Sequence, residues 1–588
     1  MKNVFRKFLI SACLTVCVGA SAAAIGTLSV APAKAAEVSE ETNYFQMVNG
    51  AEVRAVTDSC GLRFTTNVGE YMYDNAWNGY TVSFGTLIAK NVTDITAMVA
   101  EDESTYLADI PCSKQVAFED GVFTYTSAVV FDTKGWTDDE KTAAYAMELT
   151  ARAYVKLEKD GVTTYEYATA TDTTRSMRAV ANVALVKGAS ETLLGEYVNV
   201  GARNKKDYLE TSDATTNTLA VGVTAADLGV YVGAKKVDVT GENGAIDLSA
   251  LATDWTLGEN YFVSVFGADN KVYSAPVQYV TKAIENYDDL KELEVTNELV
   301  FGDKIIDGYW ALTDNFDFTS QKAIAHAGCL AKNGGTVDSP TASGTQFSKV
   351  GGVGFKGTFD GNGYTLKVNV DTYGLFGMLM AGATVKNLSL YATATNVSNA
   401  STKGQGASVI AHGIAMKESS GAVTFENLFV NMADARTKNN ESYNLSFINT
   451  TSKLMKMNNV VISVDASCTY AVEGTLKQGG AFAVTDNESY ASNFNNNTSN
   501  VFVVSANALP MSILVEKKSN TDPTKVLVSN YPKYIKGDAP DTVTHSYKDK
   551  CYTNFARIST LSEITGVSAY EELPWTYDTA TGALVWKN

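Results

Sequence analysis

The sequence predicts a mainly β protein in which a β-sandwich-like domain with two helices, a small Ig-like β domain and a right-handed parallel β-helix follow one another. Three observations predict this order. Runs of β-branched and aromatic residues fill residues 36–188, shorter strand-like runs alternate with turn signals over residues 199–283, and an Asn-containing pattern recurs within residues 299–550. Residues 1–35 have the pattern of a signal peptide, and residues 551–588 are expected to form a C-terminal cap.

The composition excludes several classes of function. Apolar residues make up 45% of the 588 residues, which is ordinary for a globular protein and excludes a disordered or collagen-like chain. The formal net charge is −18, and so acidic a protein repels nucleic acid and anionic membranes. Only three histidines occur in the whole chain, which leaves little scope for imidazole chemistry.

The N-terminus has the three parts of a secretory signal peptide. Met1 to Lys7 is basic, residues 8–33 carry no charge, and Ala33 and Ala35 supply the small residues of a cleavage site. We expect cleavage after Ala35 and a secreted, extracellular or cell-surface protein whose mature chain has a charge of −22. The uncharged stretch is long enough to cross a bilayer, so an uncleaved anchor is the alternative. Either form is compatible with association with the cell envelope.

Residues 36–188 predict a β-rich extracellular module. Thr137 and Glu140 form a capping box that begins a short helix. Apolar residues at helical spacing from Met177 to Leu185 predict a second helix, which Gly188 ends. Cys60 and Cys112 lie in this module, where they either pair or stay isolated as small buried side chains. The strand-like runs cover residues 51–56, 61–66, 81–88, 121–130, 149–157 and 163–170.

Residues 199–283 predict the small Ig-like domain. The clearest strand is Tyr261 to Phe266, and turn signals at residues 241–244 and 267–270 separate the strand-like runs. Its core sequence of about 65 residues is short for an independent domain, so we expect it to lean on its neighbours and to act as a spacer.

Four segments of the third region share an Asn followed by apolar residues one and three positions later. These are Asn387, Asn427, Asn459 and Asn500, which are 40, 32 and 41 residues apart. Such spacing fits the coils of a parallel β-helix, whose crossovers are right-handed. Because Asn tolerates left-handed backbone and its amide both donates and accepts, we expect the four side chains to stack as a structural ladder in buried bends.

The start of this region resembles the right-handed β-helix domains of bacterial surface proteins, the group with pectate-lyase-like folds. The resemblance covers about 200 residues and implies the fold. The segments that carry it are Gly308-Tyr-Trp-Ala-Leu-Thr-Asp-Asn-Phe-Asp317, Phe355-Lys-Gly-Thr-Phe-Asp-Gly-Asn-Gly-Tyr-Thr-Leu366, Gly374-Leu-Phe-Gly377 and Ala383-Thr-Val-Lys-Asn-Leu388.

The N-terminal module resembles an uncharacterised module of secreted proteins from gut Firmicutes. This resemblance implies the compartment and no activity. It is carried by Gly50-Ala-Glu-Val-Arg54, Gly61-Leu-Arg-Phe-Thr65, Phe84-Gly-Thr-Leu-Ile88, Ala151-Arg-Ala-Tyr-Val155 and Arg175-Ser-Met177.

The C-terminal residues 551–588 contain a short helical pattern and two tryptophans, Trp575 and Trp586. We expect this segment to cap the last coil of the β-helix, because an open end would expose an unpaired strand edge.

The sequence assigns no catalytic residue and no cofactor or metal. The glycines from Gly352 to Gly357 match a dinucleotide-binding pattern by letter, but no helix is expected after them, so no nucleotide is expected. His412 lacks the aspartates that accompany the histidine of β-helix polygalacturonases. Asp314, Asp317 and Asp360 are the acids best placed for sugar chemistry, but they fall in turn motifs, which favours a structural role.

One aromatic segment predicts a ligand-binding site. Tyr71, Tyr73, Trp77 and Tyr80 crowd a polar stretch between two expected strands. Rigid amphipathic rings on a loop commonly bind sugar faces and protein side chains. The alternative is that the rings pack onto their own domain, whereas the polar neighbours Glu70, Asp74, Asn75 and Asn78 favour exposure.

We therefore expect a secreted or surface protein that binds an extracellular glycan or a host surface, in adhesion or carbohydrate binding. A polysaccharide lyase or glycoside hydrolase acting through the β-helix groove is one alternative, and a structural envelope protein is another. Enzyme activity is the less favoured of these outcomes.

Overall fold

The computed structural model divides into two compact units, which are described separately. Unit 1 comprises the chain up to residue 207 together with 214–255 and 259–278, and unit 2 comprises 208–213, 256–258 and 279–588. Both are mainly β, as the sequence predicts. The expected signal peptide lies outside the described residues. These are residues 44–587 without 57–58, 91, 93, 113–116, 120, 204–206, 212–217, 221–228, 239–240, 243–244, 249–253, 267–270, 295–304, 327–353, 396–406, 415–420, 437–443, 451–454, 471–479, 486–497, 516–529 and 539–551.

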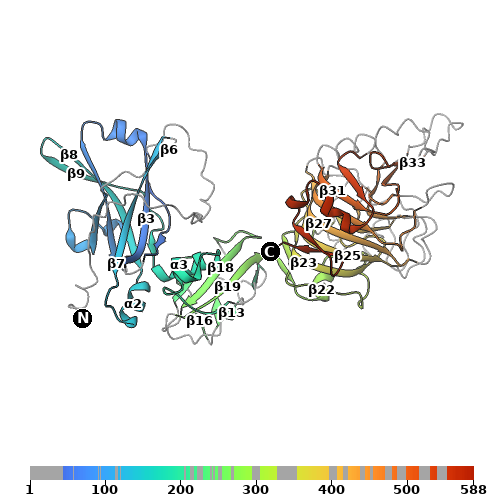
Figure 1. The fold of residues 1–588 in the computed structure, drawn as a ribbon, viewed down its shortest axis with the longest axis horizontal. Coiled ribbons are helices and arrows are strands. Elements are labelled where there is room, and N and C mark those ends of the chain that lie inside the picture. The colour runs from blue at the N-terminus through green and yellow to red at the C-terminus, as the bar shows by residue number, and fades with distance from the viewer. Residues whose placement is uncertain are drawn as a thin grey trace. The chain divides into compact units, whose positions relative to one another are not determined.

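Two antiparallel sheets share one hydrophobic core in the first part of unit 1 (Figure 1). The first sheet has the order β1-β3-β7-β6 with β2 paired to β3, and the second has the order β10-β8-β4-β5 with β9 paired to β8. Alternate side chains of long strands face inward, as the period of two requires. The strands are β1 (Phe45–Met47), β2 (Glu52–Arg54), β3 (Ser59–Gly69), β4 (Thr81–Lys90), β5 (Ala108–Cys112), β6 (Ala117–Glu119), β7 (Val122–Asp132), β8 (Leu149–Lys159), β9 (Val162–Tyr167) and β10 (Thr174–Arg175).

Both helices expected in this part are present, with the ends that their sequences predict. In α2 (Asp138–Tyr145), the Glu140 amide donates to Thr137 Oγ1 and the Thr137 amide donates to Glu140 Oε2. Helix α3 (Met177–Val186) ends before Gly188, whose φ of 90° gives the left-handed conformation that favours glycine. The shorter helices are η1 (Met72–Ala76), η2 (Ile95–Ala97), η3 (Glu103–Thr105) and α4 (Glu191–Leu194).

The second part of unit 1 consists of short strands that lean on the first part. Tyr231, Phe266 and Val272 belong to the same core cluster as the two sheets above, and Asn182 of α3 donates to Ser264 Oγ at 2.9 Å. The second part of unit 1 therefore shares one hydrophobic core with the first part. One sheet joins β11 (Asn199–Arg203), β12 (Asp207–Glu210), β14 (Gly229–Val232), β15 (Lys235–Val237), β18 (Asn260–Phe266) and β19 (Lys271–Val280), and another joins β13 (Thr218–Ala220), β16 (Gly241–Glu242) and β17 (Ala245–Asp247).

In most of unit 2 the chain passes alternately between two sheets. From β23 onward, each strand of the larger sheet is followed by a strand of the smaller one, and strands within a sheet pair in parallel except for β32 with β33. The larger sheet contains β20 (Lys282–Ile284), β21 (Tyr309–Leu312), β22 (Phe316–Asp317), β23 (Thr358–Val370), β25 (Thr384–Ala394), β27 (Val423–Asp434), β29 (Met455–Val464), β31 (Thr498–Val504) and β34 (Phe555–Ile558). The smaller sheet contains β24 (Met378–Leu379), β26 (Ala407–Ile414), β28 (Leu445–Thr450), β30 (Ala483–Thr485), β32 (Ser512–Val515) and β33 (Asn530–Lys533).

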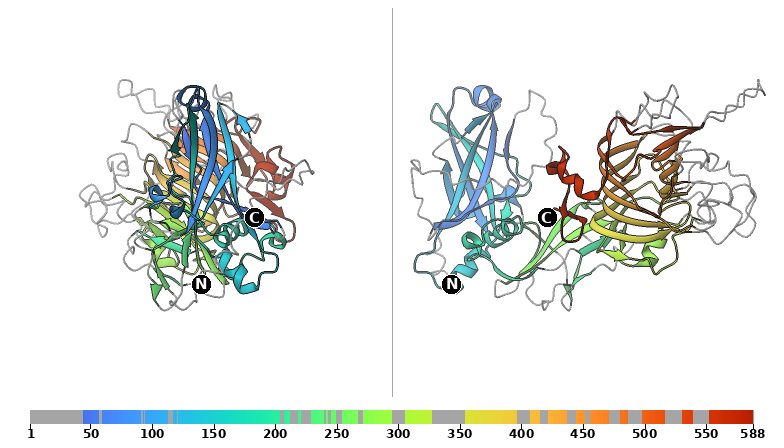
Figure 2. Two further views of the ribbon diagram at one scale, coloured as in Figure 1. Left: turned by 90° about the vertical axis from the view of Figure 1, so that its left-hand side faces the viewer. Right: turned by 45° about the vertical axis from the view of Figure 1, so that its right-hand side comes forward.

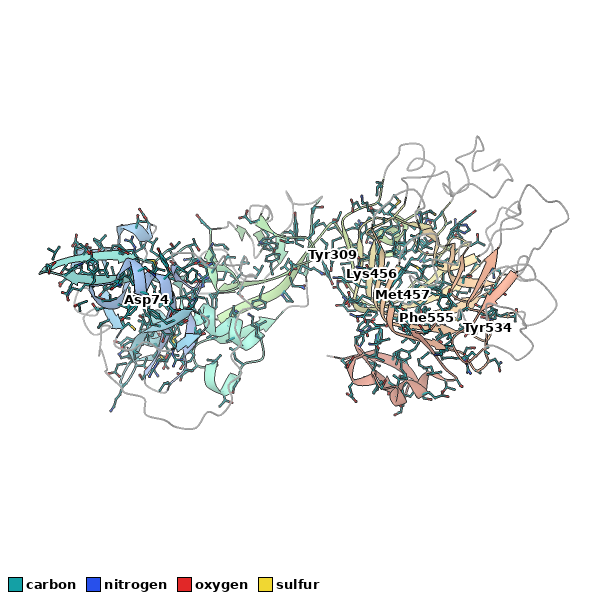
Figure 3. The ribbon with its side chains drawn as sticks, turned by 90° about the horizontal axis from the view of Figure 1, so that it is seen from above. Asp74, Tyr309, Lys456, Met457, Tyr534 and Phe555 are labelled. Atoms are coloured by element: carbon teal, nitrogen blue, oxygen red, sulfur yellow. The ribbon has the colours of Figure 1, made fainter. Side chains whose placement is uncertain are left out.

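Parallel register stacks like side chains on one another inside unit 2. Leu388, Leu428, Val460, Val501 and Phe555 occupy equivalent positions on five successive strands of the larger sheet and are all buried. Such columns fill the space between the two sheets (Phe555 is labelled in Figure 3). Short helix α5 (Tyr287–Lys291) lies next to β20 at the N-terminal end of the larger sheet.

Within the C-terminal segment, β34 pairs with β31 as the last strand of the larger sheet, and the residues that follow lie on the side of the stack. Trp575 and Leu584 pack on Phe429, Val461 and Phe502, which point outward from β27, β29 and β31. These outward side chains form an apolar stripe that must be covered, and a segment laid across the strands covers it (Figure 2). The segment contains η6 (Leu561–Gly566), η7 (Tyr570–Glu572), β35 (Trp575–Asp578) and β36 (Ala583–Trp586).

Cys60, Cys112 and Cys468 are free thiols. Of the two outcomes open for Cys60 and Cys112, the structure does not have the disulfide. Burial raises the pKa of the Cys60 thiol. Among the described residues, no helix is long and apolar enough to cross a membrane.

Candidate functional site

The aromatic segment predicted to bind ligand joins β3 to β4 at one end of the two sheets of unit 1. It contains the helical turn η1, and Asp74 of this turn is labelled in Figure 3. The structure separates its four rings into two groups. Tyr71, Tyr73 and Tyr80 are 50%, 47% and 39% exposed, whereas Trp77 is 1% exposed.

Trp77 is a core residue, so its assignment to a ligand-binding surface is wrong. Its ring contacts Phe45 and Phe84 edge-on, with centroids 5.3 and 5.7 Å away, and its Nε1 donates to Glu166 Oε2 at 2.9 Å. The wide helical turn η1 brings Trp77 back over the sheets, and its amide donates to the Met72 carbonyl oxygen at 2.9 Å. Burying this large ring is favourable because its only polar atom, Nε1, keeps a hydrogen bond. This gain decides the position of Trp77, although its neighbours in the sequence are polar.

The three exposed tyrosines sit on a segment that is fixed at several points. The Gly69 amide donates to the Tyr44 carbonyl oxygen, and the Glu70 amide donates to the Gly121 carbonyl oxygen. The ring of Tyr73 rests edge-on against Phe123, with centroids 5.7 Å apart. Together with the buried Trp77, these contacts hold the tyrosines on a rigid support, which lowers the entropy lost on binding. We call Tyr71, Tyr73 and Tyr80 the tyrosine surface.

The polar groups around the tyrosine surface are mainly acidic and amide side chains. Glu70 and Asp74 are exposed, and Asn75 Nδ2 donates to the Tyr71 carbonyl oxygen at 3.3 Å. One cation is near, since Lys159 Nζ lies 5.1 Å from the centroid of the Tyr80 ring. This segment therefore offers exposed aromatic rings together with hydrogen-bond acceptors.

The four asparagines of the expected ladder are joined by hydrogen bonds in unit 2. Nδ2 of Asn427, Asn459 and Asn500 donates to Oδ1 of the preceding asparagine at 3.0, 2.9 and 3.0 Å. All four have φ of 52–53°, the left-handed backbone anticipated for Asn. Their side chains are half-buried, whereas the sequence led us to expect buried bends.

Asp360 is the first member of this ladder, which the sequence pattern does not show. Its Oδ1 accepts from Asn387 Nδ2 at 3.1 Å and from the Asn362 amide at 2.8 Å, and Tyr309 donates its hydroxyl proton to Oδ2. Its strand carries two extra residues at the bend, so a search for equal spacing misses it. Lys386 Nζ lies 3.5 Å from Oδ2 of Asp360. These bonds occupy the carboxylate in a structural role.

Two of the three histidines lie buried in unit 2. His326 Nε2 is 2.9 Å from the Gly374 carbonyl oxygen, and His412 lies on β26 with its ring edge-on to Tyr373 at 5.0 Å. Burial lowers the pKa of His326 to about 4 and that of His412 to about 3. Asp371, which accepts from the His326 and Tyr373 amides, has its pKa raised by burial to about 7. These neutral, enclosed groups support structure.

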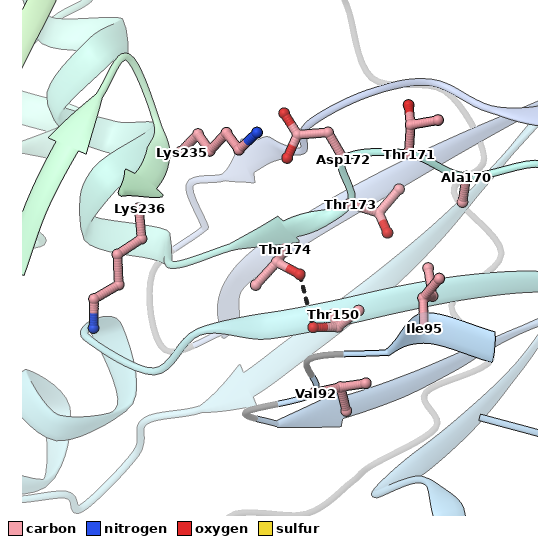
Figure 4. Close-up of a pocket in the computed structure, with 10 residues that line it drawn as sticks. All are labelled: Val92, Ile95, Thr150, Ala170, Thr171, Asp172, Thr173, Thr174, Lys235 and Lys236. Atoms are coloured by element: carbon pink, nitrogen blue, oxygen red, sulfur yellow. Dashed lines mark hydrogen bonds between the residues drawn. The ribbon is translucent and has the colours of Figure 1, made fainter. Parts of the chain in front are cut away.

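A polar pocket of about 230 Å³ lies between the two parts of unit 1 (Figure 4). Its polar side chains are largely engaged already: Thr150 pairs with Thr174 at 2.8 Å, and Asp172 is held at 2.7 Å by Arg175, which lies outside the lining. The exposed Lys235 and Lys236 stand at its rim. The remaining lining residues are Val92, Ile95, Ala170, Thr171 and Thr173.

Comparison of this chain with protein families, with curated proteins and with solved structures finds no match. In the part of the chain that the structure describes, no group of three or more His, Cys, Asp or Glu side chains is arranged to hold a metal ion. The tyrosine surface is therefore the candidate site that the geometry favours.

Proposed function

We propose that this protein is secreted or retained at a bacterial cell surface and binds extracellular material, a glycan or a host surface, through Tyr71, Tyr73 and Tyr80. The exposure of three rings on a segment anchored by the buried Trp77 carries this proposal. Exposed tyrosines on a rigid support supply large contact area at low entropic cost. The signal-peptide pattern of residues 1–35 supports the compartment.

The architecture that accompanies this function is a β-sandwich-like binding module, a small Ig-like spacer and a right-handed parallel β-helix. Strands alternating between two parallel sheets support a β-helix for unit 2, and the handedness rests on the general rule for parallel crossovers. The larger sheet carries an asparagine ladder and an apolar cover on its outer side. Both features suit a rigid stalk.

An activity on polysaccharides is the less supported alternative. Asp360, one of the three acids considered for it, is engaged by Asn387 and Tyr309. Asp317 accepts from the Thr319 hydroxyl and lies 3.5 Å from Lys367.

A binding experiment on the purified protein tests the proposal. We expect the Tyr71→Ala/Tyr73→Ala double variant to lose about tenfold or more in affinity for a ligand found on a glycan array, with only a small drop in melting temperature from the lost packing of Tyr73 on Phe123. Val56→Ala is the control, because Val56 is also exposed but lies before β3, which leads away from the site over about 33 Å. Equal affinities of all three proteins would remove the tyrosine surface as the site.

A further inference from the structure

The charges around the tyrosine surface restrict the kind of ligand that it accepts. The segment from Gly69 to Tyr80 contains two acids, Glu70 and Asp74, and no base. Both carboxylates are exposed, and the protein as a whole is strongly acidic. An anionic polymer that approached the rings would meet like charges at short range.

Among the described residues, the cation found beside these rings is Lys159, which is already engaged. Lys159 Nζ lies over the Tyr80 ring, 5.1 Å from its centroid, in a cation–π contact. A single exposed ammonium group in this position does not offset two carboxylates and the net charge of the chain. The surface therefore has no counterpart for a row of carboxylate, sulfate or phosphate groups.

The remaining groups suit hydroxyl-rich, uncharged chains. Carboxylate oxygens accept hydrogen bonds from pairs of hydroxyl groups, while ring faces pack on the C–H faces of sugars. Asn75 donates one of its amide protons to the Tyr71 backbone carbonyl oxygen, which restricts the orientation of this amide.

We infer that the tyrosine surface selects neutral polysaccharides and rejects polyanionic ones. This inference rests on the proposed function and adds the charge class of the ligand. Recognition is carried by ring contacts and neutral hydrogen bonds, so the affinity for a neutral glycan is nearly independent of ionic strength.

A matched pair of polymers tests the inference on the purified full-length protein. The probes are a panel of neutral glucans and galactans, each with its carboxymethyl derivative. We expect at least about tenfold weaker binding of the derivative at low salt, and a gap that narrows as salt shields the charges. In the Glu70→Gln/Asp74→Asn double variant, the derivative should gain affinity while the melting temperature stays the same.

The outcomes separate the two claims. Equal or tighter binding of the carboxymethyl derivative through the same tyrosines would overturn the charge selection and leave the proposed function standing. A ligand whose affinity falls about tenfold between about 50 and 500 mM salt, as for a basic protein, would also overturn it. If neither member of any pair binds, the assignment of a neutral polysaccharide as the ligand is overturned. If Tyr71→Ala/Tyr73→Ala binds like the unaltered protein, the proposed function itself fails.

Discussion

At the scale of single residues, Trp77 explains how exposed tyrosines stay in place. Its ring fills space between Phe45 and Phe84, and its indole proton reaches Glu166. The segment that carries the tyrosines is therefore attached to the core of unit 1 rather than hanging from the ends of two strands. Sequence alone could not show this, because the contacts of Trp77 come from strands distant in the chain.

Replacing Trp77 by Ala should destabilise unit 1 by about 3–5 kcal/mol, as other large-to-small core substitutions do. A melt monitored on the unit 1 transition measures the change. Tyr71→Ala is the matched control, since that ring is half exposed and should cost less than about 0.5 kcal/mol. Similar losses for the two variants would contradict the core role of Trp77.

The asparagine ladder is also determined residue by residue, and here the sequence is informative because the pattern is local. We expect Asn427→Ala to cost about 2–4 kcal/mol, since it breaks two amide hydrogen bonds and places a β-carbon at a φ of 53°. Urea unfolding of unit 2 measures this. Asn431→Ala is the control, because Asn431 is half-buried on the same strand but is not left-handed. A loss for Asn431→Ala as large as that for Asn427→Ala would show that the ladder adds nothing.

At the scale of elements, helix ends were predictable and the position of the C-terminal segment was not. The capping box at Thr137 and the glycine after α3 act over a few residues, so their signals are visible in the sequence. The C-terminal segment is placed by contacts such as Trp586 Nε1 with Ser389 Oγ at 3.1 Å, which join residues far apart in the chain. Because this segment covers Phe429 and Phe502, these two side chains can point outward from the sheet without being exposed to water.

Replacing Trp575 by Ala should loosen this cover without unfolding the stack of strands. Trp575 is fully buried over the apolar stripe, so its loss leaves a cavity under β35 and β36. We expect faster hydrogen exchange and proteolysis in residues 561–586, and unchanged protection in β25 and β27. Val585→Ala, at an exposed position of the same hairpin, should have no effect. Uniform loss of protection across unit 2 would instead make the segment part of the main core.

At the scale of the whole molecule, a small buried group of unit 2 contributes to the pH dependence of stability of this acidic chain. His326 and His412 have pKa values of about 4 and about 3, below the usual 6.5, because burial disfavours the charged ring. The unfolded chain therefore binds protons that the folded chain does not, and this contribution to stability falls as pH decreases below about 6.5.

Asp371 changes stability with pH in the direction opposite to the two histidines, so one variant tests both contributions. Its pKa is raised from 3.8 to about 7 by burial, so the folded chain binds the proton more tightly and stability from this group falls as pH rises from about 4 to about 7. Between pH 8 and pH 5, the two histidines together lower the free energy of unfolding by about 4 kcal/mol, and Asp371 raises it by about 3 kcal/mol. In the unaltered protein, the contribution of Asp371 therefore opposes that of the two histidines over this interval. Asp371→Asn removes this opposing contribution, so between pH 8 and pH 5 its stability should fall by about 3 kcal/mol more than that of the unaltered protein, measured by hydrogen exchange of the β26 amides. Parallel pH profiles for the two proteins would show that Asp371 is not protonated in the folded chain.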